Sequence, residues 1–360
     1  MRAIRVLIID DAAAERRLLA EALRADPGLA VVGSAANGRI GLEMIPVVNP
    51  DVVVLDLEMP EMDGYQVLAS LRATDPRLPV VIFSGSSQRR AQATLNALAL
   101  GAIEFIAKPS SLDGTGQALR AVVEAMSPRI KALGANASRD APAAQPPRPT
   151  DRARRALQVV VVGISTGGPD ALTALLAAIP GDFPTPILIV LHMPLPFIGP
   201  LARRLDARSA LRVTEAVNGQ VVAPGQAVIA PGERHLVVRR RGPEVLAETH
   251  PGPPENSCCP AADVLFRSAA HEFGAGALGV VMTGMGQDGL LGAREIRQAG
   301  GQVLAQDRAS SVVWGMPGHV VQAGLADEVV ALDRLAAEIS RRGMGKSMHD
   351  CPPSRAPQVG

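Results

Sequence analysis

Cysteine, aromatic residues and long apolar runs are all scarce in this sequence. Three cysteines among 360 residues, two of them adjacent at Cys258 and Cys259, match neither a disulfide framework nor the spacing of a zinc site. Aromatic residues amount to 2% of the chain, which argues against a surface that stacks on nucleic-acid bases. Proline and histidine interrupt the longest apolar candidate, at 186–201, so no run of about 18 apolar residues exists and no membrane-spanning helix is expected.

An excess of either charge is missing as well. The 36 basic and 35 acidic residues give a formal net charge of +1, which offers no field for nucleic acid or for an anionic membrane. Asp10 and Asp11 follow a short apolar segment at the N-terminus, a pattern that no secretory signal peptide shows. A soluble, cytoplasmic protein is therefore expected, and 360 residues suggest about two domains, each able to bury a core.

The first 126 residues alternate short β-branched segments with helical ones. The expected strands lie at 6–9, 31–35, 52–55, 80–83 and 104–107, and the expected helices near 12–25, 38–48, 65–73, 89–100 and 112–126. Five β–α units in succession predict an α/β fold of the flavodoxin-like type, with a parallel sheet between two layers of helices.

Polar residues occupy the carboxyl ends of these strands, the edge at which parallel sheets gather functional groups. They are Asp10, Asp11, Asp56, Ser84 and Lys108. Clustered carboxylates repel and raise one another's pKa, and Mg²⁺, which prefers oxygen ligands, would relieve that conflict. A carboxylate held by Mg²⁺ beside an ammonium and a hydroxyl is suited to accept a phosphoryl group. A single strand-end aspartate is usually a helix cap. So many matched groups, including one of only three lysines in the chain, favour a site.

These residues resemble the receiver domain of two-component response regulators. The resemblance covers about 1–126 and rests on the Asp10-Asp11 pair, on 55–60 (Leu-Asp-Leu-Glu-Met-Pro), on Phe83-Ser84 and on 105–109 (Phe-Ile-Ala-Lys-Pro). It implies phosphorylation by a histidine kinase, with Asp56 as phosphoacceptor, Ser84 and Lys108 in contact with the phosphoryl group, Asp10, Asp11, Asp56 and the Glu58 carbonyl as Mg²⁺ ligands, and Phe105 as the switch aromatic. From the sequence alone, an ordinary core phenylalanine explains Phe105 equally well.

Residues 127–156 differ in composition from both flanking regions. Dense proline in this segment cannot continue a helix or a strand, so a semi-extended linker is predicted. It would join the receiver domain at 1–126 to a second domain at 157–342, and the polar, proline-containing tail at 343–360 is expected to be disordered.

The second domain is organised around a predicted strand, turn and helix at 159–170. Four consecutive valines lead into the turn, Ser165 stands within it, and Pro169 suits the first turn of the helix that follows. Three interpretations compete for this turn. A dinucleotide-binding loop is disfavoured because Ser165 replaces its middle glycine, a structural turn with an incidental serine is the simplest, and the pattern Gly163-x-Ser165-x-Gly167 matches a nucleophile elbow.

Two further strand ends supply the partners that a nucleophile needs. The apolar run 186–191 ends at His192, and the run 278–283 leads into a glycine-rich loop that contains Met285 and Asp288. Serine, histidine and aspartate at neighbouring strand ends match nucleophile, base and orienting acid, and backbone N–H groups of the glycine-rich loop could face an oxyanion. A loop histidine and an Asp-Gly turn are the alternative interpretations.

Less distinctive segments complete the expected domain. We expect a doubly wound α/β arrangement with a loop at 193–200, a short helix at 201–205, an antiparallel insertion at 211–250, a helix at 261–273, a strand at 302–305, a loop at 311–317 and a final helix near 331–342.

The whole chain resembles the protein-glutamate methylesterases of bacterial chemotaxis, the CheB family, in which a receiver is joined to an esterase domain. Matching motifs stand at 163–169, 192–194, 230–232, 263–269, 283–289, 304–307 and 314–317. By position, the resemblance implies Ser165 as nucleophile, His192 as base, Asp288 as orienting acid and Met285 as backbone oxyanion donor. It also implies hydrolysis of γ-glutamyl methyl esters on methylated chemoreceptors, without a cofactor for that step. Some members also deamidate receptor glutamines, and the sequence leaves this second activity open.

Several positions depart from the family pattern. Leu191 replaces a usual glutamine, Cys258-Cys259 stands where a basic residue is usual, Ala261-Ala262 replaces Ser-Val, and Gly199-Pro200 interrupts the segment after His192. They leave open whether the target is a chemoreceptor or a related receptor. Two alternatives of other classes are a non-enzymatic signalling adaptor with an esterase-like docking domain, and a nucleotide-dependent oxidoreductase, which Ser165 and His192 disfavour.

Overall fold

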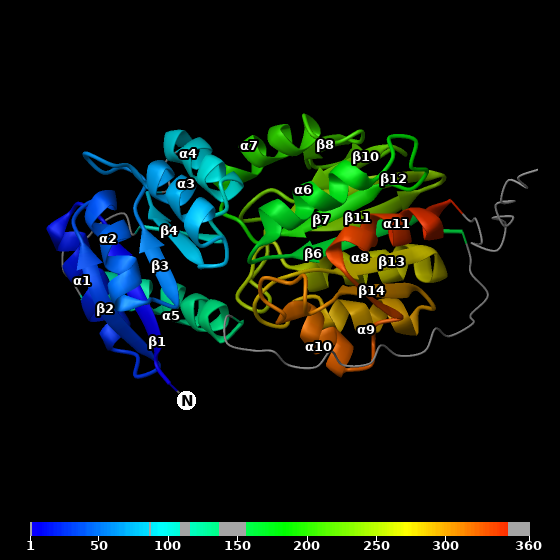
Figure 1. The fold of residues 1–360 in the computed structure, drawn as a ribbon. Helices are drawn as coiled ribbons and strands as arrows, with labels where there is room; N and C mark the ends of the chain where they lie inside the picture. The colour runs from blue at the N-terminus through cyan, green and yellow to red at the C-terminus, as the bar shows by residue number, and fades with distance from the viewer. Residues whose placement is uncertain (1, 86–87, 109–115, 137–155, 345–360) are drawn as a thin grey trace, which may run out of the picture.

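The computed structural model describes residues 2–85, 88–108, 116–136 and 156–344. Figure 1 shows two α/β domains side by side, the N-terminal one in blue and cyan and the C-terminal one in green to red. Each is built on its own parallel sheet. The fold class that the sequence predicts is therefore confirmed for both domains.

The N-terminal domain contains five β–α units in the expected order. Its elements are β1 Ile4–Ile9, α1 Ala13–Arg24, β2 Leu29–Ala35, α2 Gly38–Val48, β3 Val52–Leu55, α3 Gly64–Thr74, β4 Val80–Ser84, α4 Gln88–Ala99, β5 Glu104–Ala107 and α5 Gly116–Asn136. The strands pair in the order β2-β1-β3-β4-β5, all parallel. Because β1, β3, β4 and β5 are neighbours, the polar residues that follow them share one edge of the sheet.

Helix α5 is longer than the sequence suggested. We expected it to end near residue 126, with the linker starting at 127, but it continues through Pro128 to Asn136. Proline removes one helical hydrogen bond, and the burial of Met126, Ile130 and Leu133 against the core of the domain offsets that loss. The remainder of the expected linker, at 137–155, and the expected tail from 345 onward lie outside the described residues.

The C-terminal domain is a doubly wound sheet with a small second sheet beside it. Its elements are β6 Val159–Ile164, α6 Gly168–Ala178, β7 Ile187–Leu191, α7 Leu195–Asp206, β8 Arg212–Glu215, β9 Gln220–Val221, β10 Gln226–Ile229, β11 His235–Arg241, β12 Glu244–His250, α8 Ala262–Phe273, a 3-10 turn at Gly274–Gly276, β13 Ala277–Val281, α9 Leu290–Gln298, β14 Gln302–Gln306, α10 Met316–Gln322, β15 Glu328–Val330 and α11 Leu332–Gly343. The main sheet has the order β15-β14-β13-β6-β7-β10-β8.

The expected antiparallel insertion at 211–250 is only partly correct. Strands β11, β12 and β9 do form a separate antiparallel sheet. Strands β8 and β10, however, pair in parallel with each other and extend the main sheet beyond β7. The short alternating pattern of these two strands indicates extended structure, but it does not specify the partner or its direction, because those depend on which neighbours bury the apolar face.

Two segments expected to be loops begin or contain helices. Helix α7 starts at Leu195 rather than near 201, and α10 occupies 316–322 within and beyond the expected loop at 311–317. Proline stands in the first turn of each helix, where its missing N–H costs nothing. In α7, Phe197, Ile198 and Leu201 are buried, and their burial outweighs the cost of Pro200 inside the helix.

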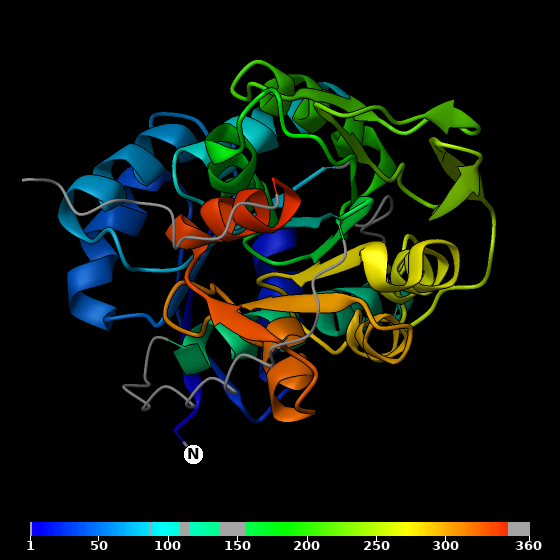
Figure 2. The same cartoon turned by 90° about the vertical axis from the view of Figure 1, so that its right-hand side faces the viewer.

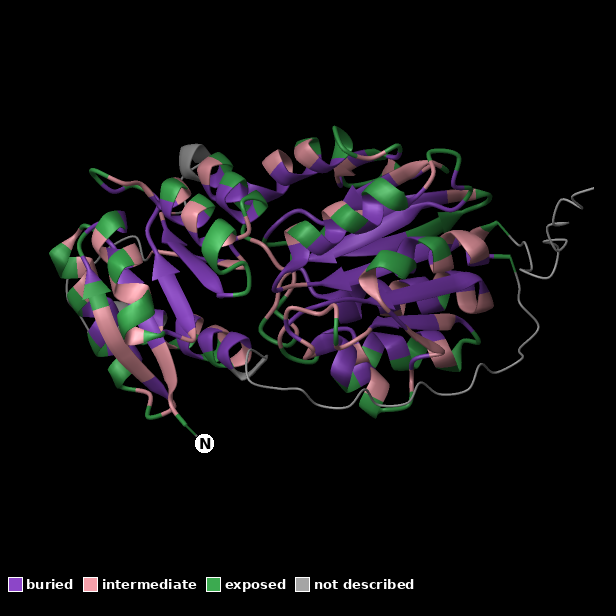
Figure 3. Cartoon of the chain, in the orientation of Figure 1, coloured by how far each residue is buried: buried purple, intermediate pink, exposed green. Residues whose placement is uncertain are grey.

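Helices cover both faces of the main C-terminal sheet. One buried cluster joins the strands to α6, α7 and α11, and a second joins the opposite face to α8, α9 and α10. Figure 2 shows α11 (red) and the pair α8 and α9 (yellow) on opposite sides of the strands. Figure 3 shows the central strands of both domains in purple, between helices whose outward faces are green or pink, whereas the edge strand β2 is largely pink. Such all-buried strands account for the continuous valine runs in the sequence.

The two domains contact each other through apolar side chains and through the packing of helix α4 against helix α7. The rings of Phe105 in the N-terminal domain and Phe197 in α7 have centroids 4.2 Å apart, tilted by 39°. The guanidinium of Arg204 donates a hydrogen bond to the carbonyl of Leu95 in α4, at 2.7 Å, and α4 and α7 lie next to each other in Figure 1. The buried cluster of the receiver also includes Val313 of the C-terminal domain. Phe105 is therefore an interface residue.

Candidate active site and phosphoacceptor site

Ser165 lies in a tight turn between β6 and α6. Its backbone N–H donates to the carbonyl of Thr283 at 3.0 Å, and its own carbonyl accepts from Gly168 at 2.7 Å. Gly167 has a φ of 75°, the left-handed region that favours glycine, and a Cβ there would stand 2.6 Å from Val312. The turn thus holds a half-buried serine between the end of a strand and the start of a helix, as the sequence predicts.

His192 and Asp288 meet directly, although 96 residues separate them in the chain. Nε2 of His192 lies 2.8 Å from Oδ2 of Asp288, and the two side chains are 14% and 2% exposed. His192 follows β7, and Asp288 lies in the loop that follows β13. Strands β7 and β13 flank β6 on either side. The sheet order therefore places the histidine and the aspartate on either side of the strand that leads to Ser165.

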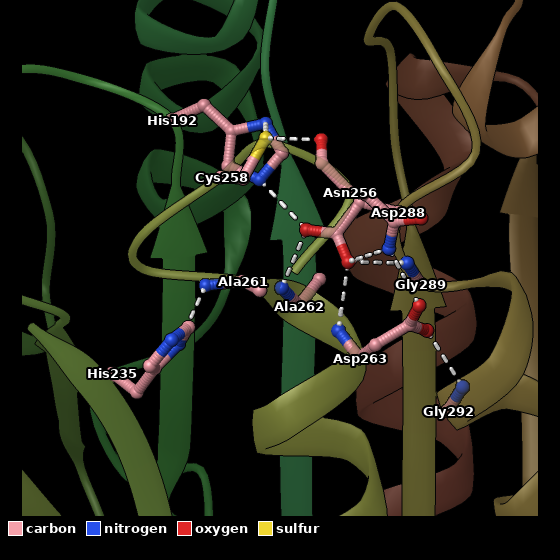
Figure 4. Close-up of polar contacts among 10 residues, drawn as sticks. All are labelled: His192, His235, Asn256, Cys258, Ala261, Ala262, Asp263, Asp288, Gly289 and Gly292. Carbon is pink, nitrogen blue, oxygen red and sulfur yellow. Dashed lines mark hydrogen bonds and ion pairs between the residues drawn. The ribbon is translucent and has the colours of Figure 1, made fainter. Parts of the chain in front are cut away.

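Asp288 is held by more donors than any other carboxylate of the site. Its Oδ2 also accepts from the backbone N–H of Ala262, and its Oδ1 accepts from the N–H groups of Asp263 and Gly289. A fifth donor is the side-chain amide of Asn256, at 3.3 Å (Figure 4). Because a carboxylate offers about four lone-pair positions, these contacts fill Asp288 completely and fix its orientation toward the imidazole.

The pKa shifts of the pair follow from these contacts. Burial favours neutral forms, yet the bonds to Asp288 and to the Cys258 thiol raise the pKa of His192 to about 9. Burial would likewise raise the pKa of Asp288, but donation from His192, Asp263 and Ala262 holds it below its usual range. The site therefore stabilises an imidazolium beside a carboxylate, which is the charge state that forms when a histidine takes a proton from a serine.

The structure shows the predicted triad only in part. Among the described residues, its hydroxyl makes no direct hydrogen bond to the imidazole. A Cβ on Gly284 would lie 2.8 Å from Cβ of Ser165, so the glycine-rich loop that continues to Met285 runs directly beside the serine. Catalytic hydrogen bonds often tighten only when substrate binds. Two members of the predicted triad are thus joined, and the assignment of Ser165 and Met285 remains a prediction.

Sequence reasoning missed three residues of this site. Asn256 donates to both Asp288 and Asp263, whose side chain is fully buried. Asp263 in turn accepts from the N–H of Gly292 at 2.7 Å, which ties α8 to α9. Cys258 places its Sγ 3.6 Å from Nδ1 of His192. Two of the three had a signal in the sequence, because Asp263 opens a motif that matches the family and Cys258 belongs to a pair that departs from it, whereas Asn256 had none.

The receiver site is assembled around one lysine. Nζ of Lys108 lies 3.1 Å from Oδ2 of Asp10 and 2.9 Å from Oδ2 of Asp56, and it also pairs with Glu15. Carboxylate oxygens of Asp10, Asp11 and Asp56 lie within 4.8 Å of one another. The predicted residues therefore do meet at one edge of the sheet, and Glu15 is an addition that the sequence analysis did not include.

The carboxylates of this cluster fit a hard dication. Burial and the neighbouring Asp56 raise the pKa of Asp10 to about 6 against the opposing effect of Lys108. Burial also raises the pKa of Asp56, and the surrounding carboxylates raise that of Lys108 although its own burial opposes this. One ammonium thus faces more negative charge than it can balance, and the oxygen-only donor set suits Mg²⁺.

Ser84 and Glu58 lie near the ends of β4 and β3, and their roles remain predictions. Ser84 is buried at the end of β4, and its carbonyl accepts from the backbone N–H of Lys108 at 2.8 Å. Glu58 lies two residues after Asp56 in the loop that follows β3, so a Mg²⁺ contact through its carbonyl stays a prediction. The described residues contain no helix that is both long and apolar enough for a membrane span.

Comparison with known proteins assigns both halves of the chain. A response regulator receiver domain family model matches residues 6–120, and a CheB methylesterase family model matches residues 160–339. A "Protein-glutamate methylesterase/protein-glutamine glutaminase" from Trichodesmium erythraeum (strain IMS101) is 45% identical over 350 residues, which cover 95% of this chain and 99% of that protein. The chain belongs to the CheB methylesterase family. A protein of the same name from Nocardioides sp. (strain ATCC BAA-499 / JS614) is 44% identical over 359 residues, covering 95% of this chain and 96% of the relative.

A solved structure supports the same family assignment for the C-terminal domain. The catalytic domain of the Thermotoga maritima CheB methylesterase is 37% identical and covers 52% of this chain and 99% of its own length, with a TM-score of 0.51. The predicted membership of the CheB family, with a receiver domain joined to an esterase domain, is confirmed. The roles of individual residues are not tested by these likenesses and remain predictions.

Proposed function

We propose that this chain hydrolyses γ-methyl esters of glutamate side chains on chemoreceptors and releases methanol. The observation that carries the proposal is the buried hydrogen bond between His192 and Asp288, beside the turn that holds Ser165, in a chain of the CheB family. The printed names of the relatives support this substrate class. Ester hydrolysis by a serine needs a nucleophile, a base and an orienting acid, and the three residue types stand at neighbouring strand ends.

The proposed reaction has two stages. The Ser165 oxygen attacks the ester carbonyl while a His192 nitrogen takes the hydroxyl proton, and the N–H of Met285 donates to the developing oxyanion. The imidazolium then returns the proton to the leaving methoxide, so methanol departs and an acyl-enzyme remains. In the second stage His192 takes a proton from water, the hydroxide attacks the acyl group, and Ser165 regains its proton as the glutamate carboxylate leaves.

The same site could act on an amide. A glutamine side chain would form the same acyl-enzyme if His192 protonates the departing ammonia, a step more demanding than the loss of methanol. The relatives carry both activities in their names. Ammonia release from unmethylated receptor, measured beside methanol release from methylated receptor, decides whether this chain also deamidates.

Regulation follows from the receiver domain. Asp56 would accept a phosphoryl group from a chemotaxis histidine kinase, with Ser84 and Lys108 in contact with its oxygens. Mg²⁺ held by Asp10, Asp11, Asp56 and the Glu58 carbonyl would neutralise charge on the phosphoryl oxygens during transfer. Phosphorylation would rearrange the side of the sheet that carries Ser84 and Phe105.

The interface offers a route from that rearrangement to the esterase. Phe105 packs on Phe197, which lies in α7, and α7 begins only three residues after His192. A shift of Phe105 would therefore loosen the contact between α4 and α7 and alter access to the histidine. Kinase and receptor cytoplasmic domains are the partners that this function requires, and the cytoplasm is the compartment in which they meet.

The experiment compares methanol release from methylated receptor membranes with and without a small phosphodonor. Wild-type protein should release methanol and respond to the phosphodonor, whereas Asp56→Ala should show the same rate under both conditions. Equal stimulation of both proteins would contradict the regulatory proposal. A complete lack of methanol release by wild type would instead favour a non-enzymatic adaptor, which the joined His192–Asp288 pair argues against.

A further inference from the structure

Cys258 lies against the ring nitrogen of His192 that Asp288 leaves free. Asp288 occupies Nε2, and Sγ of Cys258 stands 3.6 Å from Nδ1 (Figure 4). Donor atoms of His192, Cys258 and Asp288 all lie within 4.8 Å of one another. A thiol and an imidazole that face each other are two of the donors that Zn²⁺ prefers. The thiol itself donates to the carbonyl of Asn256 at 3.4 Å, a contact that is given up when the metal replaces its proton.

The distance between these two atoms agrees with a tetrahedral metal. Bond lengths of about 2.0 Å to nitrogen and about 2.3 Å to sulfur, at a tetrahedral angle, place the two ligands about 3.5 Å apart. The observed separation of 3.6 Å therefore needs almost no movement of either side chain. Little reorganisation has to accompany binding, which favours affinity.

A rigid turn keeps the thiol in this position. Glu255 and Cys258 exchange two backbone hydrogen bonds, of 3.0 and 2.8 Å, across a two-residue turn. The central residues Asn256 and Ser257 both have positive φ, 49° and 61°. Arg267 in α8 pairs with the Glu255 carboxylate at 2.5 Å and ties the turn to that helix. The turn that presents Cys258 also places the Asn256 amide on Asp288.

Asp288 would orient the histidine rather than bind the metal. Its oxygens already accept from five donors, among them three backbone N–H groups. A carboxylate that holds one ring nitrogen of a metal-bound histidine fixes the ring and increases its basicity, which is a common arrangement around zinc. The protein thus supplies two ligands and one positioned carboxylate, and water would complete the coordination.

We propose that His192 Nδ1 and Cys258 Sγ form a Zn²⁺ site that inhibits the enzyme reversibly. On binding, the Cys258 thiol and the protonated Nδ1 of His192 each lose a proton to solvent, and the resulting thiolate and Nδ1 lone pair each form one bond to the metal. With Nε2 held by Asp288 and Nδ1 held by Zn²⁺, neither nitrogen can take a proton from Ser165. Two protein ligands make a weaker site than the four of a structural zinc centre, so the metal exchanges. The inhibition, though not the binding, rests on the proposed function.

The test uses the full-length protein with two matched variants, Cys258→Ala and Cys259→Ala. Each removes one of two adjacent thiols, but only the first removes a proposed ligand. Methanol release is measured without phosphodonor across a Zn²⁺ titration and again after addition of a chelator. Binding is followed independently by Co²⁺ substitution, because a thiolate bound to Co²⁺ gives an absorption band in the near ultraviolet that needs no turnover.

Zn²⁺ should inhibit wild type and Cys259→Ala equally, the chelator should restore both, and Cys258→Ala should need at least about tenfold more Zn²⁺. The Co²⁺ band should appear with wild type and Cys259→Ala and disappear with Cys258→Ala. Equal inhibition of all three proteins, or a band that survives in Cys258→Ala, would overturn the proposal. If wild type releases no methanol at all, the proposed function fails, and the Co²⁺ band still decides whether the metal site exists.

Discussion

Asp10 in the receiver and Asp288 in the esterase domain are equally buried, at 1% and 2% exposure, yet their pKa values shift in opposite directions. Asp10 shares Lys108 with two other carboxylates, and its pKa rises to about 6. Asp288 accepts five hydrogen bonds, and its pKa falls. The hydrogen-bond donors and charges around each carboxylate, rather than burial alone, therefore set the direction in which its pKa shifts. The hydrogen-bond partners of Asp288 are all supplied by the chain, whereas the carboxylates around Lys108 carry more negative charge than that one ammonium balances.

The largest expected effect is on the nucleophile. Ser165→Ala should reduce methanol release by about 10⁶-fold, because removal of a serine nucleophile leaves only the binding and oxyanion contributions. Melting temperature and phosphorylation of Asp56 by a small phosphodonor should be unchanged, which shows that the two sites are independent. Retained esterase activity in this variant would remove Ser165 from the mechanism.

Asp288→Asn tests whether the five hydrogen bonds to the Asp288 carboxylate matter for activity and stability. An amide nitrogen would have to face one of the five donors, and the imidazole would lose its orienting charge, so activity should fall by about 10⁴-fold. The same conflict should lower the free energy of unfolding by about 1–3 kcal/mol. Kinetics and thermal melts on one preparation measure both effects. A variant that keeps wild-type stability would mean that the five contacts to Asp288 are not as the structure shows.

Glu338 in α11 extends the comparison to a carboxylate outside both sites. Burial raises the pKa of Glu338, but hydrogen bonds from Arg341 and Arg342 outweigh that effect and lower the pKa to about 2. A depressed folded-state pKa adds stability that is present above the unfolded value near 4.5 and is lost as the pH falls toward about 2. Glu338→Gln should therefore be less stable than wild type at pH 7, by about 1–2 kcal/mol. The difference should shrink in melts at pH 4 and 3, and a constant difference would contradict this assignment.

The smallest effect is expected at Asp10, with the opposite sign. Without Mg²⁺, Asp10→Asn removes one of the crowded carboxylates around Lys108 and should raise the free energy of unfolding by about 1 kcal/mol at pH 7. Saturating Mg²⁺ should stabilise wild type more than the variant and so reduce or reverse the difference. A lower melting temperature for the variant in metal-free buffer would contradict the claim that Asp10, unlike Asp288, destabilises the folded protein.

The two sites also differ in how far the sequence could predict them. The receiver residues follow strands of a regular β–α repeat, and the carboxyl ends of neighbouring parallel strands lie at one edge of the sheet, so the sequence predicts that these residues lie close together. The structure adds Glu15, which pairs with Lys108. In the esterase domain the order of strands β13, β6 and β7 likewise places His192 close enough to Asp288 for a hydrogen bond. Asn256 and Cys258, by contrast, lie in a tight turn outside the β–α repeat, and a hydrophobic periodicity does not predict which side chains such a turn brings to the site.

Three wrong expectations share one physical cause. Pro128 and Pro200 were taken to end or exclude helices, and the 211–250 region was taken to be wholly antiparallel. In each case local preference was overridden by burial: Met126 and Ile130 pack α5 onto the core of its domain, Phe197 and Leu201 bury α7, and Val213 and Val228 bury β8 and β10 in the main sheet. Such compensation depends on residues far away in the chain and cannot be computed from a local pattern.

By itself the sequence determined the two parallel sheets, the strand-end residues of both sites and the family, because buried strands and strand-end motifs are local signals. Only the tertiary structure decided that Asp288 is saturated with donors, that Phe105 packs on Phe197 across the domain interface, and that the Cys258 thiol faces His192. These contacts join segments whose separation in space depends on how whole layers pack, and short-range preferences carry no information about it.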